Sequence, residues 1–468
     1  MNIVKTAKLK ITSHTKTLEP TLEIYRKALI FYIDVVKKEW DSLKELDNRR
    51  RLLLLETISH KTKQHPEVKY NFDKDFYKFP CYLRRACIME AIGCVESYYS
   101  NYERWQKEKE ETLFKGKKFH KKSPTLQLKH NSFPVLYKPE MFKREDNGGI
   151  KIKVFHNNDW VWIDITIKDK NLLSSRRYRF TDYTEANPKL VKKGKKFYLH
   201  IPYEKKVKLY DRNDVAISVD LGLTNSAVVN AMRSDGTVLG RLFINQPKEK
   251  DRLNHTINKL SKAKRNSHII KAPNYWRVIN NLQREITQDT ANKIVDFALK
   301  FNAGVIVFEY LSRMKLPKDV YGAKRLRFKL QYWAKQTTYK KTLEKAHSLG
   351  IRLSRVLARG TSMYAFDGSG EVARNSKKDI AVFTTGKEYH ADLSASYNTG
   401  ARYFIRELLK PLPEMVRLQV QAKVPELVVR TQQTLSSLTR LQEALSLNAL
   451  DTSASRIQDR EASSTATA

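Results

Sequence analysis

Residues 214–243, DVAISVDLGLTNSAVVNAMRSDGTVLGRLF, decide the fold of the C-terminal half of the sequence. Apolar and β-branched residues fill three short runs, and Ser234-Asp235-Gly236 is a typical turn between the second and the third. Short runs of this kind, bounded by turn residues, predict three consecutive β-strands. The first run ends in a carboxylate, Asp220, which taken alone is more typical of an ordinary strand end than of a site.

Strand and helix patterns alternate after this stretch, which predicts an α/β domain. We place the domain at residues 213–449 and expect a disordered tail at 450–468, where the residues are small and polar. The expected elements are a basic helical stretch at 249–301, a buried strand GVIVFEYL at 304–311, a helix at 326–349, a strand IRLSRVL at 351–357, a helix at 393–409 and weakly amphipathic helical residues at 411–447.

The N-terminal half shows strand patterns that are interrupted by helices. Residues 3–12, IVKTAKLKIT, alternate apolar and polar residues as a half-buried strand does. Helical spacing begins at Thr17 and returns in residues 49–62 and 81–112. Short alternating runs separated by turn residues then fill about 125–210, which predicts antiparallel strands.

These patterns predict a β-barrel that is assembled from two separate parts of the chain. We assign the first strand of the barrel to residues 1–16 and the remainder to 125–212, with a helical domain inserted at 17–124. The chain as a whole is therefore expected to be a multidomain protein of the α+β and α/β classes.

The charge of the chain indicates its partner. The 468 residues include 88 Lys and Arg against 50 Asp and Glu, so the formal net charge is +38. An excess of this size favours a polyanion as partner. Nucleic acid is a better candidate than an anionic membrane surface, because the basic residues are spread along the chain and not gathered in one amphipathic helix.

Cysteine and hydropathy patterns exclude several other classes. Cys81, Cys87 and Cys94 lie in one apolar helical segment without a CxxC pair, so we expect small buried side chains and not a disulfide framework or a thiolate zinc site. The N-terminus has no apolar signal region, and no apolar run is long enough to span a bilayer. We expect a soluble cytoplasmic protein, associated with the nucleoid of a prokaryote and with no membrane partner.

Three carboxylates lie where apolar elements end or begin. Asp220 ends the first predicted strand, Glu309 ends the strand GVIVFEYL, and Asp392 begins a helix. Asp392 alone is typical of a helix N-cap, whereas Glu309 on a buried strand is costly unless it is paired. Together the three acids form the pattern of a divalent-metal cluster of the RNase H type, with oxygen ligands that suit Mg²⁺ or Mn²⁺.

The segments around these acids carry a family resemblance. DLGLTN (220–225), VFEYLS (307–312) and DLSASYN (392–398) resemble the three motifs of the split RuvC nuclease domain. Their arrangement is similar to that of TnpB proteins of insertion sequences and of compact type V CRISPR effectors. KKGKKFYLHIPYEKK (192–206) and LNHTINKLSKAKRN (253–266) resemble the strand pair before the first motif and the basic helix after it. The resemblance extends over about residues 1–410.

The resemblance implies an activity, cofactors and partners. TnpB-like proteins bind a guide RNA, derived from a transposon or from a CRISPR array. They recognise a short motif beside the target and cleave double-stranded DNA at a single RuvC site. It implies Asp220, Glu309 and Asp392 as catalytic residues and ligands of two Mg²⁺ ions, with Asp220 bridging them. Asn225 and Asn398 are candidates for orienting these ligands. In the family's terms the barrel is the wedge domain and the inserted helices are the recognition domain.

A channel for a guide–target duplex needs basic residues along much of the chain. The candidates for nucleic-acid contact are Lys117, Lys118, Lys121, Lys122, Arg177, Lys195, Lys196, Lys262, Lys264 and Arg265. Each could equally be a solvated surface residue.

The segment between the second and third motifs departs from the family pattern. Many TnpB-like proteins carry a zinc ribbon with two CxxC pairs there, but residues 357–390 contain no cysteine. Ala365, Gly368, Phe383 and Gly386 occupy the ligand positions. We therefore expect a metal-free ribbon with two glycine turns, packed through Tyr364, Phe366 and Phe383, and no bound zinc. His390 is expected to be a surface residue, although a position near the metals is the alternative.

Two other functions remain open at the level of sequence. One is an RNA-guided DNA-binding repressor without cleavage, against which the complete set of three acids argues. The other is an RNase H-like nuclease or transposase without a guide, for which the basic β-domain with its helical insertion has no evident task. The oligomeric state is left open by the sequence.

Overall fold

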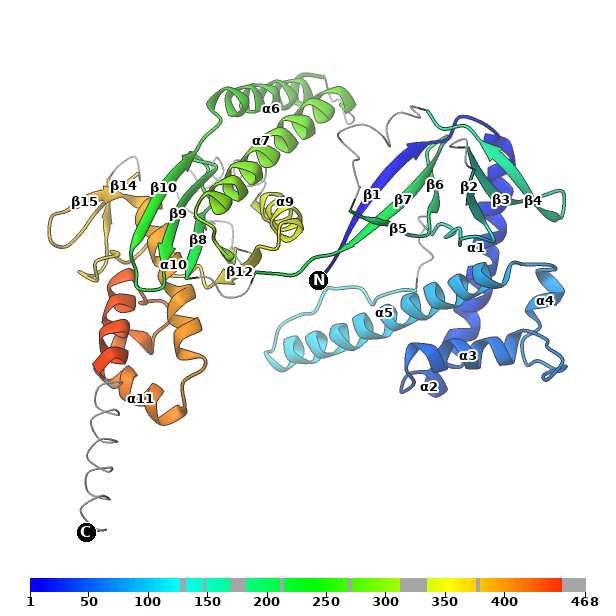
Figure 1. Ribbon diagram of the computed structural model, residues 1–468, viewed down its shortest axis with the longest axis horizontal. Coiled ribbons are helices and arrows are strands. Elements are labelled where there is room, and N and C mark those ends of the chain that lie inside the picture. The colour runs from blue at the N-terminus through cyan, green and yellow to red at the C-terminus, as the bar shows by residue number, and fades with distance from the viewer. Residues whose placement is uncertain are drawn as a thin grey trace, which may run out of the picture. The chain divides into compact units, whose positions relative to one another are not determined.

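The computed structural model describes residues 1–126, 132–145, 149–168, 182–210, 214–267, 272–311, 335–375 and 379–447. The chain divides into two compact units (Figure 1). The N-terminal unit is Asn2–Lys206, and the C-terminal unit is Val207–Ala468 together with Met1, whose ammonium group donates a hydrogen bond to the carbonyl oxygen of Val207. Each unit is described by itself.

The helices of the N-terminal unit lie between its first strand and the rest of its strands in the sequence. Asp47 caps α3 by accepting hydrogen bonds from the backbone N–H groups of Arg49 and Arg50, which explains why that helix begins there. The expected helices at 49–62 and 81–112 are confirmed. The elements are α1 (Thr15–Lys38), α2 (Trp40–Leu43), α3 (Asn48–Ser59), α4 (Phe72–Asp75) and α5 (Cys81–Phe114).

The strands of this unit form two antiparallel sheets. One sheet holds β1 (Asn2–Lys10), β7 (Lys196–Lys206), β5 (Thr184–Glu185) and β6 (Lys189–Lys193), and β1 pairs with β7 along its whole length. The other sheet holds β2 (Phe142–Arg144), β3 (Ile150–His156) and β4 (Asp159–Ile165).

In the described part of this unit, a single bridge, Ile11–Ile167, connects the ends of β1 and β4, while Val135 bridges Lys189 of β6. The mixed α and β composition that the sequence predicts is therefore confirmed. The strands in the described part of the unit are not joined into the closed barrel that was expected. Two separate sheets, each with one face on the helices, already bury the alternating apolar residues, so burial does not require closure.

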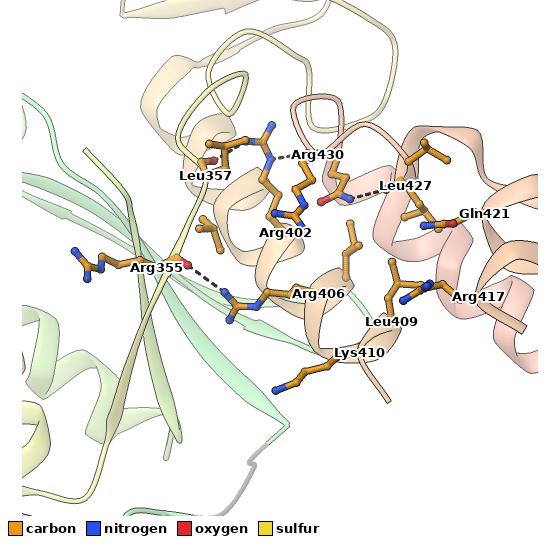
Figure 2. Close-up of a pocket in the computed structure, with 14 residues that line it drawn as sticks. Arg355, Leu357, Arg402, Arg406, Leu409, Lys410, Arg417, Gln421, Leu427 and Arg430 are labelled. Atoms are coloured by element: carbon orange, nitrogen blue, oxygen red, sulfur yellow. Dashed lines mark hydrogen bonds between the residues drawn. The ribbon is translucent and has the colours of Figure 1, made fainter. Parts of the chain in front are cut away.

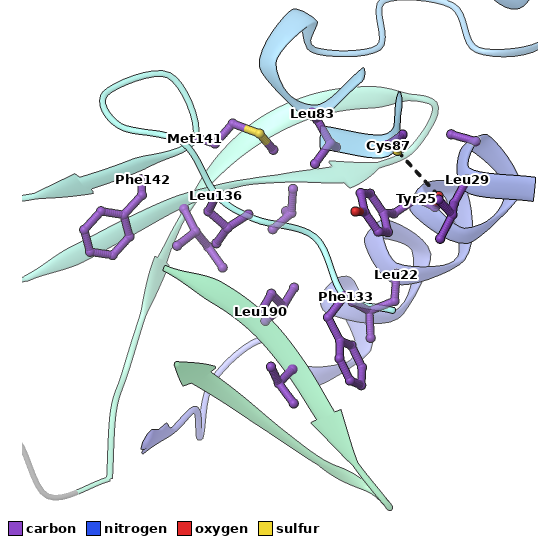
Figure 3. Packing of buried hydrophobic residues seen from close by; sticks show 14 of the residues in the cluster. Leu22, Tyr25, Leu29, Leu83, Cys87, Phe133, Leu136, Met141, Phe142 and Leu190 are labelled. Atoms are coloured by element: carbon purple, nitrogen blue, oxygen red, sulfur yellow. Dashed lines mark hydrogen bonds between the residues drawn. The ribbon is translucent and has the colours of Figure 1, made fainter. Parts of the chain in front are cut away.

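One hydrophobic core holds the helices and both sheets of the N-terminal unit together (Figure 3). Tyr25 of α1 lies at its centre, fully buried, and its hydroxyl donates a 2.6 Å hydrogen bond to Glu90 of α5. Burial raises the pKa of Tyr25, so this hydroxyl stays a donor at every physiological pH. The apolar residues of α1 recur at helical spacing, and this buried face packs into the core.

The cysteines of α5 differ in their surroundings. Cys87 is buried in the core, as expected, but Cys81 is exposed and Cys94 is half-buried, so the expectation of three buried thiols is wrong for Cys81. All three are free thiols. In the part of the chain that is described, no helix combines the length and the apolar character that crossing a bilayer requires.

The C-terminal unit is built on a five-stranded sheet with the order β10-β9-β8-β11-β12. The three strands expected from residues 214–243 are confirmed as an antiparallel meander, and β11 and β12 add in parallel. The strands are β8 (Val215–Asp220), β9 (Ala227–Arg233), β10 (Val238–Ile244), β11 (Val305–Glu309) and β12 (Arg352–Val356).

Helices cover both faces of this sheet (Figure 1). Ala216 of β8 faces α10 (Ala391–Leu409), while its neighbour Ile217 faces α7 (Pro273–Lys300) and α9 (Lys335–Ser348). Because successive side chains of a strand point to opposite faces, a strand that is apolar throughout must be covered on both sides. The α/β domain that the sequence predicts is therefore a three-layered unit, with helices on both faces of the sheet.

Two helical expectations need correction. The basic stretch expected at 249–301 is two helices, α6 (Pro247–Ser267) and α7, separated by a break before Pro273. Proline lacks an N–H and is tolerated at a helix start, so Pro273 marks the beginning of a second helix. The residues at 411–447 are α11 (Glu414–Lys423), the short 3₁₀ turn η3 (Pro425–Leu427) and a last helix at 435–447. The expected tail lies outside the described residues.

Candidate active site

Asp220 and Glu309 lie at the same edge of the central sheet. Strand β8 runs parallel to β11, and the last pair in their register is Val219 with Phe308. The next residue on each strand is a carboxylate, Asp220 on β8 and Glu309 on β11. Parallel pairing places the carboxyl ends of both strands together, so the two acids become neighbours although they are far apart in the chain.

Asp392 reaches this edge from the first turn of α10. The N-cap of α10 is His390 and not Asp392, since Nδ1 of His390 accepts a hydrogen bond from the backbone N–H of Leu393 at 3.4 Å. The His390 ring also packs edge-on against Phe243 at 4.9 Å between centroids and is half-buried. His390 is therefore a capping residue, which corrects the expectation of a surface histidine, and Asp392 is left without a capping task.

Small and polar residues seat α10 closely on the sheet. A Cβ atom at Gly400 would lie only 3.1 Å from both Met232 Sδ and Ser218 Oγ. The Ser218 hydroxyl donates to the carbonyl oxygen of Ser396 at 2.7 Å, and the amide of Asn230 donates to the hydroxyls of Ser218 and Ser396. These buried bonds hold α10 against β8 and β9 at one height, which positions Asp392 at the sheet edge.

Gly222 shows directly that the first and third motifs meet. A Cβ atom at Gly222 would lie 3.5 Å from Oδ2 of Asp392 and 2.8 Å from the carbonyl oxygen of Asn225. A side chain there would collide with the backbone at Asn225, so the loop after Asp220 needs glycine. Asp220, Glu309 and Asp392 are each half-buried, which leaves them within reach of solvent and of a substrate.

The electrostatics of the site are those of carboxylates held close together. Burial, followed by the charges of Glu309 and Asp392, raises the pKa of Asp220 well above its usual value, and only the charge of Arg374 opposes this. Burial also raises the pKa of Glu309, although a hydrogen bond from Thr361 and the charge of Arg402 partly oppose it. The three acids therefore repel one another, which is the condition that a bound cation relieves.

Arg402 of α10 connects this site to the loops around it. Its guanidinium is buried and donates to four carbonyl oxygens, those of Leu357, Arg359, Thr431 and Gln433, at 2.6–3.1 Å. Burial lowers the pKa of Arg402 to about 10, while the charge of Glu309 opposes the shift. The charged side chain of Arg402 thus connects α10 to the loops after β12 and η3 through hydrogen bonds.

The donor set suits a hard divalent cation. Three carboxylates supply only oxygen, the ligand type that Mg²⁺ and Mn²⁺ prefer, and their mutual repulsion favours a cation between them. Within the described ranges, no group of three or more His, Cys, Asp or Glu side chains is gathered tightly enough to hold a metal ion as it stands. The three residues fit the ion by the chemistry of their oxygen donors.

The segment between the second and third acids forms a small three-stranded sheet, β13 (Ala373–Arg374), β14 (Ile380–Val382) and β15 (Glu388–His390). Gly368 and Gly386 adopt positive φ angles of 81° at two turns. Ala365 and Phe383, which precede these turns by three residues, are buried, and Phe366 packs edge-on against Phe383 at 5.5 Å. Apolar contacts therefore occupy the space between the two turns.

Asn398 anchors this segment and does not orient the acids. Its amide donates to the carbonyl oxygens of Thr361 and Tyr364, and its Oδ1 accepts from the backbone N–H of Leu435. These bonds use both donors of the buried amide and its oxygen on backbone groups and not on an acid, which corrects the idea that Asn398 positions metal ligands.

We expect the purified protein to contain no stoichiometric zinc, because no thiolate lies at the two turns and Ala365 and Phe383 pack between them. Elemental analysis of the protein tests this, and nuclease activity should survive a zinc-selective chelator while it requires Mg²⁺. One zinc per chain would contradict the prediction.

The basic residues singled out in the sequence lie on exposed parts of both units. Lys117, Lys118, Lys121 and Lys122 follow α5, Lys195 and Lys196 lie at the β6–β7 turn, and Lys262, Lys264 and Arg265 lie near the end of α6. Lys121 forms an ion pair with Glu108, and Lys264 lies over the ring of Trp276. Arg177 lies outside the described residues. Exposure is compatible with a nucleic-acid contact at each of the described positions.

Sequence reasoning missed the residues that tune the acids. Arg374, Arg402, Thr361 and Thr399 all act on Asp220 or Glu309, and the Thr399 hydroxyl lies 3.3 Å from Oε1 of Glu309. Thr399 and Arg402 follow Asp392 on the same helix at spacings of seven and ten residues, which return to one face of a helix. This spacing is a sequence signal for Thr399 and Arg402, but not for Thr361 and Arg374, which lie outside α10.

Comparisons with known proteins divide between the two parts of the chain. The Aq_aa04 family model matches residues 5–156. The uncharacterized protein aq_aa04 of Aquifex aeolicus (strain VF5) is 30% identical over 151 residues, which cover 29% of this chain and 81% of that protein. The TnpB-like protein aq_aa05 of the same organism is 23% identical over 231 residues, which cover 45% of this chain and 75% of that protein. The similarity to TnpB-like proteins expected from the motifs is confirmed.

The chain is also similar to solved structures. The mini-RNA-guided endonuclease CRISPR-Cas_phi3 matches with a TM-score of 0.47 at 11% identity, covering 85% of this chain and 92% of that chain. The Cas12f1–sgRNA–target DNA complex matches with a TM-score of 0.45 at 14% identity, covering 85% of this chain and 98% of that chain.

Proposed function

The chain belongs to the Aq_aa04 family. From its similarity to a TnpB-like protein and from its three carboxylates, we propose that it is an RNA-guided DNA endonuclease. It binds a guide RNA, recognises a short motif beside the target and cleaves double-stranded DNA by hydrolysis of phosphodiester bonds. One observation carries the proposal above the others. Asp220, Glu309 and Asp392 come from three separate elements and lie at one sheet edge, where the charges of Glu309 and Asp392 raise the pKa of Asp220.

The three carboxylates are the residues that would hold divalent cations. Bound Mg²⁺ supplies a lowered pKa for an attacking water and stabilises the charge on the leaving oxygen. Asp220 is best placed to be shared between two ions, since both other acids act on it. Arg402 holds α10 and the loops after β12 and η3 in place, and Thr399 and Thr361 restrain the Glu309 carboxylate.

The charge of the chain supports nucleic acid as the partner. Folding does not require an excess of 88 basic over 50 acidic residues, and this excess lowers stability unless a polyanion compensates it. A guide–target heteroduplex is bound through its backbone and shape, which needs many dispersed cations and not one patch. The basic residues on both units meet that need.

We expect the protein, purified from cells that express its native locus, to carry a discrete noncoding RNA. Sequencing the copurifying RNA after nuclease treatment checks this, with the same chain expressed without its flanking DNA as the control. Addition of that RNA and Mg²⁺ should then produce cleavage of a DNA that matches the guide.

The results separate the candidate functions. A bound RNA with cleavage supports the proposal, and a bound RNA with target binding but no cleavage would instead indicate a guided repressor. Cleavage without any RNA would indicate a guide-independent nuclease or transposase and would overturn the proposal.

A further inference from the structure

A cavity of about 580 Å³ lies in the C-terminal unit, beside the C-terminal half of α10 (Figure 2). It is enclosed by the end of β12, the C-terminal half of α10, α11 and the segment after η3. The lining residues are Arg355, Val356, Leu357, Arg402, Ile405, Arg406, Leu409, Lys410, Arg417, Gln421, Leu427, Val428, Arg430 and Gln433. No carboxylate is among them, whereas six carry a positive charge.

Three of the six cations are already engaged by the protein. Arg402 gives its hydrogen bonds to backbone carbonyl oxygens. Arg406 binds Glu407 and also donates to the carbonyl oxygen of Arg355 and to Ser354. The guanidinium of Arg355 lies over the rings of Tyr310 and Tyr339, each 5.0 Å away, and Figure 2 shows it pointing out of the cavity. These residues build the wall.

The other three cations leave donors for a ligand. Lys410 and Arg430 are exposed, and no hydrogen bond or ion pair is found for their side chains in the described part of the unit. Arg417 is half-buried and reaches only Glu414, at 3.8 Å, which is a weak contact at the limit of an ion pair. Three cations beside one hollow, without compensating acids in its lining, store repulsion that an anion would relieve.

The floor of the cavity is apolar. Leu357, Ile405, Leu409, Leu427 and Val428 supply aliphatic surface between the cations, and Val428 is 63% exposed and Leu357 44%. In Figure 2 Leu409 lies among the labelled cationic side chains. Inorganic phosphate alone would leave this surface uncovered. A phosphate that carries a sugar, as in a nucleotide chain, matches both the cations and the aliphatic floor.

We propose that this cavity binds a phosphodiester group of a bound nucleic-acid strand, with its sugar against the apolar floor. Lys410, Arg417 and Arg430 contact the phosphate oxygens, and Arg402 holds the wall without touching the ligand. The inference rests on the proposed function, since it takes nucleic acid as the partner. It adds a contact site on α10, the helix whose first turn supplies Asp392. The same helix would therefore contact the nucleic-acid strand and carry one of the three acids.

The test compares two double variants of the full chain, R417Q/R430Q and the matched control K300Q/K340Q. Lys300 and Lys340 are exposed cations of the same unit outside the cavity, so both variants lose the same charge. Fluorescence anisotropy measures the affinity for a labelled 20-nucleotide RNA and for the corresponding single-stranded DNA over a range of salt concentrations. Circular dichroism checks that both variants are folded.

We expect R417Q/R430Q to weaken binding about tenfold, and to reduce the slope of log affinity against log salt by about 0.7, for the loss of contact with one phosphate. The control should change the affinity less than threefold. A loss confined to RNA or to DNA identifies which strand occupies the cavity.

Two results would overturn the proposal. Equal affinity of both double variants for RNA and for DNA removes the cavity from the nucleic-acid path while the proposed function stands. Binding of AMP to the native chain, lost in R417Q/R430Q without any effect on strand binding, would assign the cavity to a free nucleotide. If the native chain binds neither strand, the proposed function fails together with this site.

Discussion

Replacing Asp220 by alanine should reduce DNA cleavage at least about a thousandfold, while binding of RNA and target DNA stays close to native. The reason is that Asp220 is the acid on which both other carboxylates act, so its loss removes the group best placed to be shared by two cations. Single-turnover cleavage by the RNA-loaded protein in Mg²⁺, with binding measured separately, checks the prediction.

Asp296→Ala is the matched control, because Asp296 is an exposed aspartate on α7 of the same unit. It should retain native cleavage. If Asp220→Ala still cleaves at a rate near that of the control, the assignment of the active site is wrong.

Asp220→Asn separates a catalytic loss from a folding defect. The pKa of Asp220 is raised in the folded protein. Neutral pH lies above the pKa of an unfolded aspartate, so ionising Asp220 in the folded state lowers the free energy of unfolding there. Without metal, the asparagine variant should therefore melt at or above the temperature of the native protein, even though it does not cleave. A lower melting temperature would mean that Asp220 also holds the fold.

Arg402→Met should be the most destabilising single change that conserves side-chain size at this site, with a cost of roughly 3 kcal/mol or more. The change leaves four carbonyl oxygens without their donor and removes the positive charge that acts on Glu309. The melting temperature of the C-terminal unit should fall by roughly 6–12 °C. Arg402→Lys should recover little, because an ammonium group has only three donors and cannot reproduce the fork.

Arg406→Met is the control for this prediction. Arg406 lies one turn later on α10 but is exposed, so its loss should cost less than about 1 kcal/mol. Equal melting temperatures for the two methionine variants would show that the hydrogen bonds of Arg402 do not stabilise the C-terminal unit as predicted.

Much of the sheet could be predicted from local patterns. The strands β8, β9 and β11 coincide with apolar runs, because a strand that is covered on both faces must be apolar along its length, whereas the edge strand β10 is only partly buried. The break before Pro273 was missed because basic helical residues continue on both sides of it. The closed barrel was predicted wrongly because alternating apolar and polar residues show that a strand has one buried face. They do not show which strand pairs with its edge.

The sequence by itself determined the identity of the acids, the excess of positive charge and the absence of cysteines at the two turns beside the site. These are properties of single residues and short runs, which need no partner to be recognised. It also indicated that Asp220 and Glu309 each end a buried strand, since an acid directly after an apolar run has few other positions to occupy.

Only the tertiary structure decided which of these groups act on one another. The parallel register of β8 and β11, the close seat of α10 at Gly400 and the four carbonyl oxygens around Arg402 bring together residues that are distant in the chain. The same packing assembled a basic cavity from β12, α10, α11 and η3. Repulsion, burial and hydrogen bonding depend on distances through space, and a periodic pattern along the chain specifies faces but not those distances.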